Sequence, residues 1–200
     1  MPSTTEMSLC EPHLTPIKLV YFNHLMKRIN LDIDPCDHIT ADAIGKPGQR
    51  VFYLQAQKAD QSYTILIEKI QVQTLAIGIE KFIAELEVHN LSLTESVADY
   101  DDDQMRILVV GTPLFRAGDI GIGYDSDRDL MVLVTKEILL DEMDEEDASI
   151  VRFWCSRNQA KALALWSMEL ANRGRQNCPQ CGLPMEPDGH FCLKKNGHRH

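Results

Sequence analysis

Hydrophobic positions between residues 39 and 174 follow two periods, one typical of strands and one typical of helices. Short runs of β-branched and aromatic residues, each bounded by Gly, Pro, Asp or Ser, predict β-strands. Apolar residues spaced three and four apart predict a helix where they make one stripe. The strands expected on this basis form two groups of three, at 39–45, 50–57 and 62–69 and then at 117–125, 129–139 and 149–156. A helix is expected after each group, at 71–87 and at 158–172.

The order of three strands and a helix therefore occurs twice. Short motifs correspond as well, because DAIG at 42–45 resembles GDIG at 118–121 and Gln71 occupies the place of Gln159. One unit alone would leave its sheet half covered, so the two units are expected to share a core. The predicted fold class is α+β, with two βββα-type repeats around a largely antiparallel sheet. The alternative is one irregular α+β domain in which the matching motifs are coincidental.

The chain divides into an arm, a body and a tail. Residues 1–32 contain three prolines and little periodicity, which favours a flexible N-terminal arm. Within the arm, PIKLVYFNHLMKRI can instead form a short helix that docks on the body. The body is predicted over 33–174, with units 33–90 and 115–174 and an acidic, solvated connection at 91–114; residues 175–200 form a C-terminal segment.

Charge is unevenly distributed between body and tail. The net charge is −10, yet residues 172–200 hold five Lys/Arg against two Asp/Glu and carry +3, which leaves −13 for residues 1–171. An acidic body repels nucleic acid and anionic membranes, so only the tail favours phosphates. The N-terminus has no basic stretch followed by a long apolar run, and IKLVYF is far too short to cross a bilayer. We therefore expect a cytoplasmic protein that does not bind membranes.

The tail contains the most specific motif of the chain. Cys10, Cys36 and Cys155 are scattered, whereas CPQCGLPMEPDGHFC gathers three cysteines and a histidine into fifteen residues. Two thiolates separated by two residues can reach one ion, and soft thiolates with one imidazole favour zinc over magnesium or calcium. The predicted ligands of a closed, structural zinc site are Cys178, Cys181, His190 and Cys192. The metal would then supply the folding free energy of this segment, about 10 kcal/mol or more.

Other interpretations of the tail remain open. Cys178 and Cys181 can be a redox-active pair, or all three cysteines can be free thiols. A thioredoxin-type pair opens a helix after a strand, whereas Pro179 and Gly182 are typical of a loop. His190 is the least certain ligand because it lies only two residues before Cys192, and His198 or His200 can replace it.

Several stretches resemble an uncharacterised bacterial family, the domain-of-unknown-function family 3090. They are GKPGQRVFYLQAQ, IEKIQVQTLAIGIEKF, GDIGIGYDSDRDLMVLV and CPQCGLPMEPDGHFCLKKNGHRH, which span about four-fifths of the chain from near Asp34 to the end. The family usually ends on Asn-Gly-Tyr-Arg where this chain has NGHRH, which favours His190 over His198 as the shared ligand. The resemblance implies no activity.

Three functions are consistent with these patterns. The first is a non-enzymatic binding module with a structural zinc site and a protein partner, because no catalytic triad, paired carboxylates or dinucleotide motif is evident. The second is an enzyme whose site lies between the repeats, at the DIGIGYD strand or at the helix starts marked by Gln71 and Gln159. The third is nucleic-acid binding through the basic tail, by Lys194, Lys195 and Arg199.

Overall fold

The computed structural model describes residues 28–90, 93–107, 109–139, 144–174, 178–182, 185, 192 and 194. The elements follow one another along the chain in the order β1 (Asn30–Ile33), β2 (His38–Ile44), β3 (Val51–Lys58), β4 (Gln61–Ile67), α1 (Lys69–His89), β5 (Ala117–Asp125), β6 (Leu130–Glu137), β7 (Ile150–Ser156) and α2 (Arg157–Asn172), with a 3₁₀ turn at Glu145–Asp147. The α+β class predicted from the sequence is confirmed. No helix in the described part of the chain is both long and apolar enough to span a bilayer.

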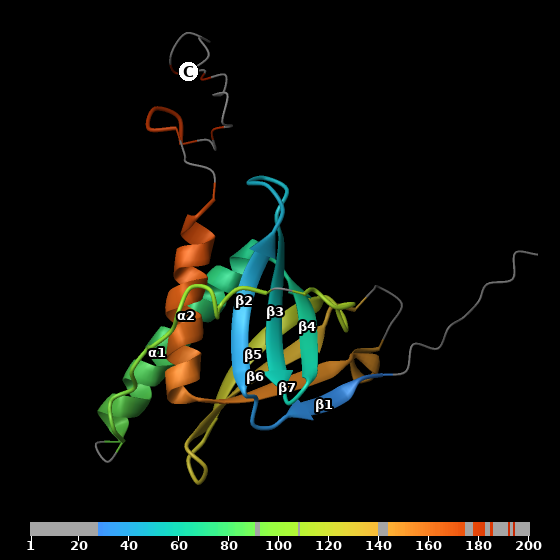
Figure 1. The fold of residues 1–200 in the computed structure, drawn as a ribbon, viewed down its shortest axis with the longest axis vertical. Helices are drawn as coiled ribbons and strands as arrows, with labels where there is room; N and C mark the ends of the chain where they lie inside the picture. The colour runs from blue at the N-terminus through green and yellow to red at the C-terminus, as the bar shows by residue number, and fades with distance from the viewer. Residues whose placement is uncertain are drawn as a thin grey trace, which may run out of the picture.

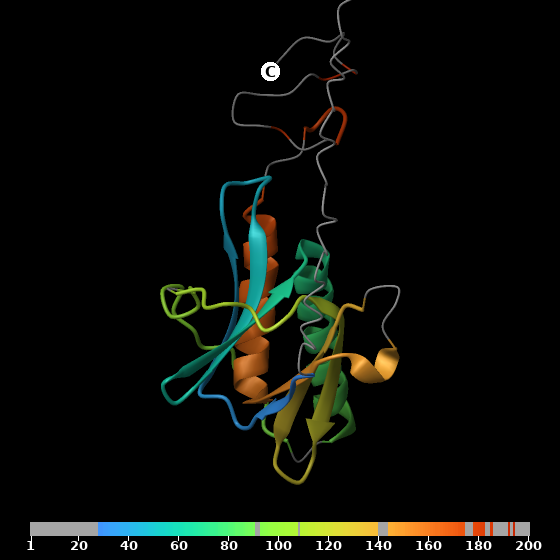
Figure 2. The ribbon, with the colours of Figure 1, turned by 90° about the vertical axis from the view of Figure 1, so that its right-hand side faces the viewer.

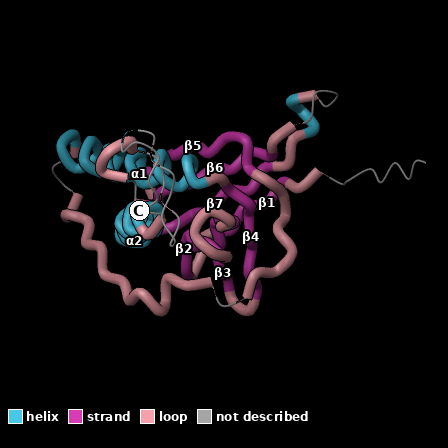
Figure 3. Tube along the Cα trace, turned by 90° about the horizontal axis from the view of Figure 1, so that it is seen from above, coloured by secondary structure: helices cyan, strands magenta, loops and turns pink. Residues whose placement is uncertain are grey.

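The strands form two sheets. β2, β3 and β4 make an antiparallel sheet in chain order, and the second sheet has the order β1-β7-β6-β5. In the second sheet β5, β6 and β7 are antiparallel neighbours, whereas β1 pairs with β7 in parallel. Figures 1 and 3 show both helices side by side at one edge of the two sheets. Each predicted unit is thus a three-stranded meander followed by its helix.

The helix of each unit packs on the first strand of the other unit. Figure 2 shows α2 beside β2, and α1 beside β5. The buried face of α1 consists of Val72, Leu75, Ala76, Ile79 and Ile83. The helix α2 buries residues at the same spacing, Ala160, Leu163, Ala164, Ser167 and Ala171, and also Arg157, Ala162, Trp166 and Leu170. The two units therefore share one core, and their origin as copies of one another stays a prediction.

The predicted arm ends earlier than the sequence suggested. Residues 30–32 belong to β1, which pairs in register with β7 from Asn30↔Ile150 to Ile33↔Phe153. Four residues are too few to show a strand period, and the partner strand lies about 120 residues away, so local patterns gave no signal. Residues 1–27, including most of the PIKLVYFNHLMKRI segment, lie outside the described residues.

The connection between the units crosses α2 and then the outer face of the first sheet (Figure 1). Asp101, Asp102 and Asp103 are exposed, as predicted for a solvated loop. The connection is nevertheless anchored, because Thr40 Oγ1 donates to the Met105 carbonyl at 2.5 Å and the Ile107 N–H donates to Asp42 Oδ2 at 2.9 Å. It therefore belongs to the folded body.

Candidate metal centre

Three cysteine sulfurs meet in the C-terminal segment. The Sγ atoms of Cys178, Cys181 and Cys192 all lie within 4.8 Å of one another, and this is the group with metal-binding geometry among the described residues. Cys178 and Cys192 are buried, and Cys181 is half-buried. None of the three forms a disulfide, and the 3.9 Å between Cys178 Sγ and Cys192 Sγ is about twice the length of a disulfide bond, about 2.0 Å.

A tight turn positions the first two sulfurs. The Gly182 N–H donates to the Cys178 carbonyl at 2.8 Å, and Gly182 has a φ of +75°, which a residue without Cβ adopts at little cost. The turn aims backbone N–H groups of Cys181 and Gln180 at Cys178 Sγ, the latter at 3.4 Å. These hydrogen bonds, chiefly that from Cys181, hold the pKa of the Cys178 thiol below its ordinary value. The turn thus favours the thiolate, the form that binds metal.

The cluster lies beyond the C-terminal end of α2, away from the sheets (Figure 1). Three sulfurs at this spacing can hold a metal ion. His190, the fourth predicted ligand, lies outside the described residues, as do His198 and His200. Of the three tail cations predicted to contact phosphates, Lys194 is exposed, and Lys195 and Arg199 lie outside the described residues.

The two helix starts named as an alternative site make equivalent contacts. Gln71 Nε2 donates to the carbonyls of Ala117 and Gly118 at 3.1 and 2.8 Å. Gln159 Nε2 donates to those of Cys36 and Asp37 at 3.3 and 3.0 Å. The side-chain amide of each glutamine therefore links the first turn of its helix to the start of a strand in the other unit. A hollow lies beside each one, of about 380 Å³ at Gln71 and about 370 Å³ at Gln159.

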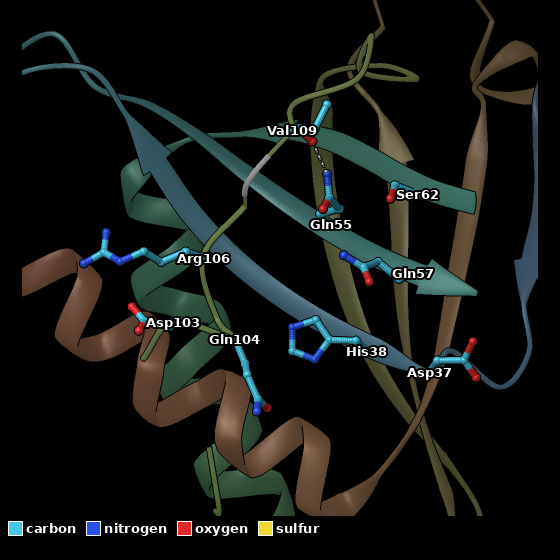
Figure 4. A pocket seen from close by; sticks show the side chains of 9 residues that line it. All are labelled: Asp37, His38, Gln55, Gln57, Ser62, Asp103, Gln104, Arg106 and Val109. Atoms are coloured by element: carbon cyan, nitrogen blue, oxygen red, sulfur yellow. Dashed lines mark hydrogen bonds between the residues drawn. The ribbon is translucent and has the colours of Figure 1, made fainter. Parts of the chain in front are cut away.

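A larger hollow of about 730 Å³ lies on the outer face of the first sheet, under the connection. Figure 4 shows the side chains of His38 on β2 and of Gln55 and Gln57 on β3. Those of Arg106 and Asp103 point away from His38. Burial lowers the pKa of His38, which favours the neutral form of the ring. Its Nε2 is buried and has no hydrogen-bond partner in the described part of the chain. Sequence patterns gave no signal for this residue, because a single histidine at a strand start is common.

A comparison with known protein families gives a match over most of the chain. The family model described as "Protein of unknown function (DUF3090)" matches residues 31–192. The chain belongs to the DUF3090 family. Neither a curated protein nor a solved structure matches it.

The DUF3090 match begins within β1 and ends at Cys192, so it contains both units and all three cysteines of the cluster. The resemblance noted from the sequence is thereby confirmed. The match stops short of residues 193–200, so the comparison of NGHRH with the end of other DUF3090 chains stays an expectation. The family description assigns no activity to the cluster.

Proposed function

We propose that the protein binds zinc through Cys178, Cys181, Cys192 and His190, and that it acts as a non-enzymatic binding module for a protein partner. The zinc is structural in this proposal, because four protein ligands leave no open position for water or substrate. It folds the C-terminal segment into a defined surface at the end of α2. The protein partner recognises that surface.

The spacing of the sulfurs carries the proposal. Two sulfurs bound to one zinc at about 2.3 Å, at a tetrahedral angle, lie about 3.8 Å apart. Cys178 Sγ and Cys192 Sγ are 3.9 Å apart although 14 residues separate them. Unbonded thiols have no strong attraction that would hold three of them within 4.8 Å. A cation between thiolates supplies that attraction.

The ligand type favours zinc over other common ions. Calcium and magnesium prefer oxygen ligands, whereas thiolates and imidazole suit zinc. The buried thiols Cys36 and Cys155 are both free, which supports a reducing compartment, and we propose the cytoplasm.

Cobalt substitution of the full chain tests the ligand set. Co²⁺ in place of zinc reports tetrahedral geometry by the intensity of its d–d absorption bands and thiolate ligation by its sulfur-to-cobalt charge-transfer bands. We expect a tetrahedral spectrum with three thiolates for the wild-type chain. His190→Asn should change the d–d bands as a water enters the shell, whereas the matched variant His198→Asn should leave them unchanged.

Three results would count against the proposal in different ways. An octahedral spectrum without charge-transfer bands would remove the cysteine site altogether. A change on His198→Asn but not on His190→Asn would move the fourth ligand to the end of the chain. A wild-type spectrum that already shows a bound water would contradict a closed, structural site.

A further inference from the structure

Three of the four outer edges of the two sheets are short or covered. The edge strand β1 has four residues, and α2 packs along the edge strand β2. The connection pairs with the edge strand β4, since the Leu114 N–H donates to the Thr64 carbonyl at 2.8 Å. The Leu66 N–H donates in turn to the Phe115 carbonyl at 3.0 Å. These edges therefore offer few free backbone groups to a further strand.

The fourth edge, β5, is long and open. It has nine residues and contains neither proline nor lysine, which commonly protect a strand edge. Gln71 binds the carbonyls of Ala117 and Gly118 at its start. Between Asp119 and Asp125, β6 is the only element in the described part of the chain whose backbone bonds to β5. Every second residue there directs its N–H and C=O away from β6, where no strand pairs with them.

The hollow beside Gln71 lies along this edge. Its volume is about 380 Å³, and it is lined by residues of α1 and of β5. Leu75, Ile120 and Ile122 contribute apolar side chains, and Thr74 is exposed beside them. Figure 3 shows β5 on the outside of its sheet with α1 next to it. An open strand edge beside a helix, with an apolar hollow between them, can take an extended peptide as an added strand.

We propose that an extended segment of a protein partner, in which apolar residues alternate with Lys or Arg, pairs with β5 as an additional strand of the second sheet. This contact surface is formed by α1 and β5, so its existence does not depend on the zinc centre.

The inner face of β5 explains the apolar positions of the segment. Ile120, Ile122 and Tyr124 pack against the core, and the two isoleucines also line the hollow. The side chains of neighbouring strands stand next to one another on each face of a sheet. Alternate residues of an added strand would therefore enter the apolar hollow.

The outer face of the same edge explains the basic positions. Successive side chains of a strand point to opposite faces, so Asp119 and Asp125 lie on the face away from Ile122. Asp119 is exposed. Its neighbour on β6, Lys136, forms an ion pair with Glu145 at 3.5 Å instead. Lys or Arg side chains of an added strand would meet both carboxylates.

The two carboxylates also disfavour a second copy of this chain as the partner. Antiparallel pairing of two free edges with full overlap would set Asp119 of each chain opposite Asp125 of the other. Like charges directly opposite each other destabilise a strand pair. A basic segment would replace this repulsion by attraction.

Hydrogen exchange of the full-length chain with synthetic peptides tests the pairing. The probes are heptapeptides in which Lys alternates with Val, Leu or Phe, and the same peptides with Glu in place of Lys are the controls. We expect at least one Lys peptide to bind with a Kd below about 1 mM. Its binding should slow the outward amides of residues 119–125 at least about tenfold. The Glu peptides should bind at least about tenfold more weakly.

Variants of the chain locate the binding surface. Asp119→Lys should weaken binding of the Lys peptide about fivefold or more. Asp127→Lys changes the net charge by the same amount in the exposed turn after β5, and it should change the affinity less than about twofold.

A second pair of variants tests the hollow. Thr74→Trp places a large side chain at the hollow and should weaken binding about tenfold. Val88→Trp, on the same helix at a residue that is 71% exposed, should leave the affinity unchanged. Unchanged exchange in β7 would show that all four variants remain folded.

Four results would overturn the proposal. The first is no binding by any Lys peptide, and the second is binding that leaves the amides of residues 119–125 in rapid exchange. The third is an equal loss of affinity for Asp119→Lys and Asp127→Lys, which would reduce the attraction to net charge alone. The fourth is a dimer of the chain itself in which these amides are already slow, which would make a second copy the occupant.

Discussion

Gln71 and Gln159 occupy the third position of their helices, and each donates from its side-chain amide to two carbonyls where the first strand of the other unit begins. The amide oxygen of each also accepts the N–H of the residue before its helix, at 2.8 Å from Glu68 and 2.9 Å from Ser156. Each of these glutamine side chains thus caps the first turn of its own helix and links it to the other unit.

Replacing either glutamine by alanine should weaken the whole domain. Each change removes three hydrogen bonds at a part-buried site, so we expect a loss of about 1–2 kcal/mol in the free energy of unfolding for each variant. Urea denaturation of the full chain measures this loss. Gln73→Ala, on the same helix, is the matched control and should cost under about 0.5 kcal/mol. Equal effects of the Gln71 and Gln73 variants would contradict the bridging role.

Trp166 anchors α2 on β2. The indole is fully buried, donates to the Ala41 carbonyl at 2.6 Å and lies under the guanidinium of Arg173 at 4.5 Å. Trp166→Phe removes the donor and should cost about 1–3 kcal/mol, and Trp166→Ala about 3–5 kcal/mol. Trp154→Phe is the matched control, because its Nε1 bonds to Asp32 near the surface and its loss should cost about 1 kcal/mol or less. Thermal or urea unfolding distinguishes these values.

The ion pair between Arg157 and Asp129 makes the free energy of unfolding depend on pH in the acid range. Two hydrogen bonds from the buried Arg157, at 2.7 and 3.1 Å, hold the pKa of Asp129 below its ordinary value. A carboxyl whose pKa is lower in the folded state stabilises the fold above its unfolded pKa, and this contribution is lost as the pH falls below about 4. Urea denaturation at several pH values should therefore show a flatter acid limb for Asp129→Asn than for the wild type. Asp127→Asn, at an exposed position in the same turn, should follow the wild-type curve; a curve as flat as that of Asp129→Asn would contradict the assignment.

Local patterns predicted most of the elements. The strand expected at 117–125 is β5 with the same bounds, and the helix expected at 71–87 is α1 with two residues more at each end. Period and turn residues lie within one short window, which is why sequence alone located them. The spacing of the cysteines is equally local, and the structure brings all three sulfurs together.

Contacts between distant residues were not predictable in this way. β1 pairs with a strand about 120 residues away, and Arg157 binds Asp129 together with the Thr94 carbonyl of the connection at 2.7 Å. An arginine at a helix start resembles a solvated charge in the sequence, and only the folded chain encloses it. The hollow beside Gln71 likewise lies between residues of α1 and residues of β5, which belong to different units.

The most direct test of the zinc site is elemental analysis of the purified full-length chain. We predict one zinc per chain for the wild type, about one for Cys10→Ser, whose cysteine precedes the family match, and a loss of most of the metal for Cys192→Ser. A wild-type chain without zinc, or a Cys192→Ser chain that retains a full equivalent, would contradict the account.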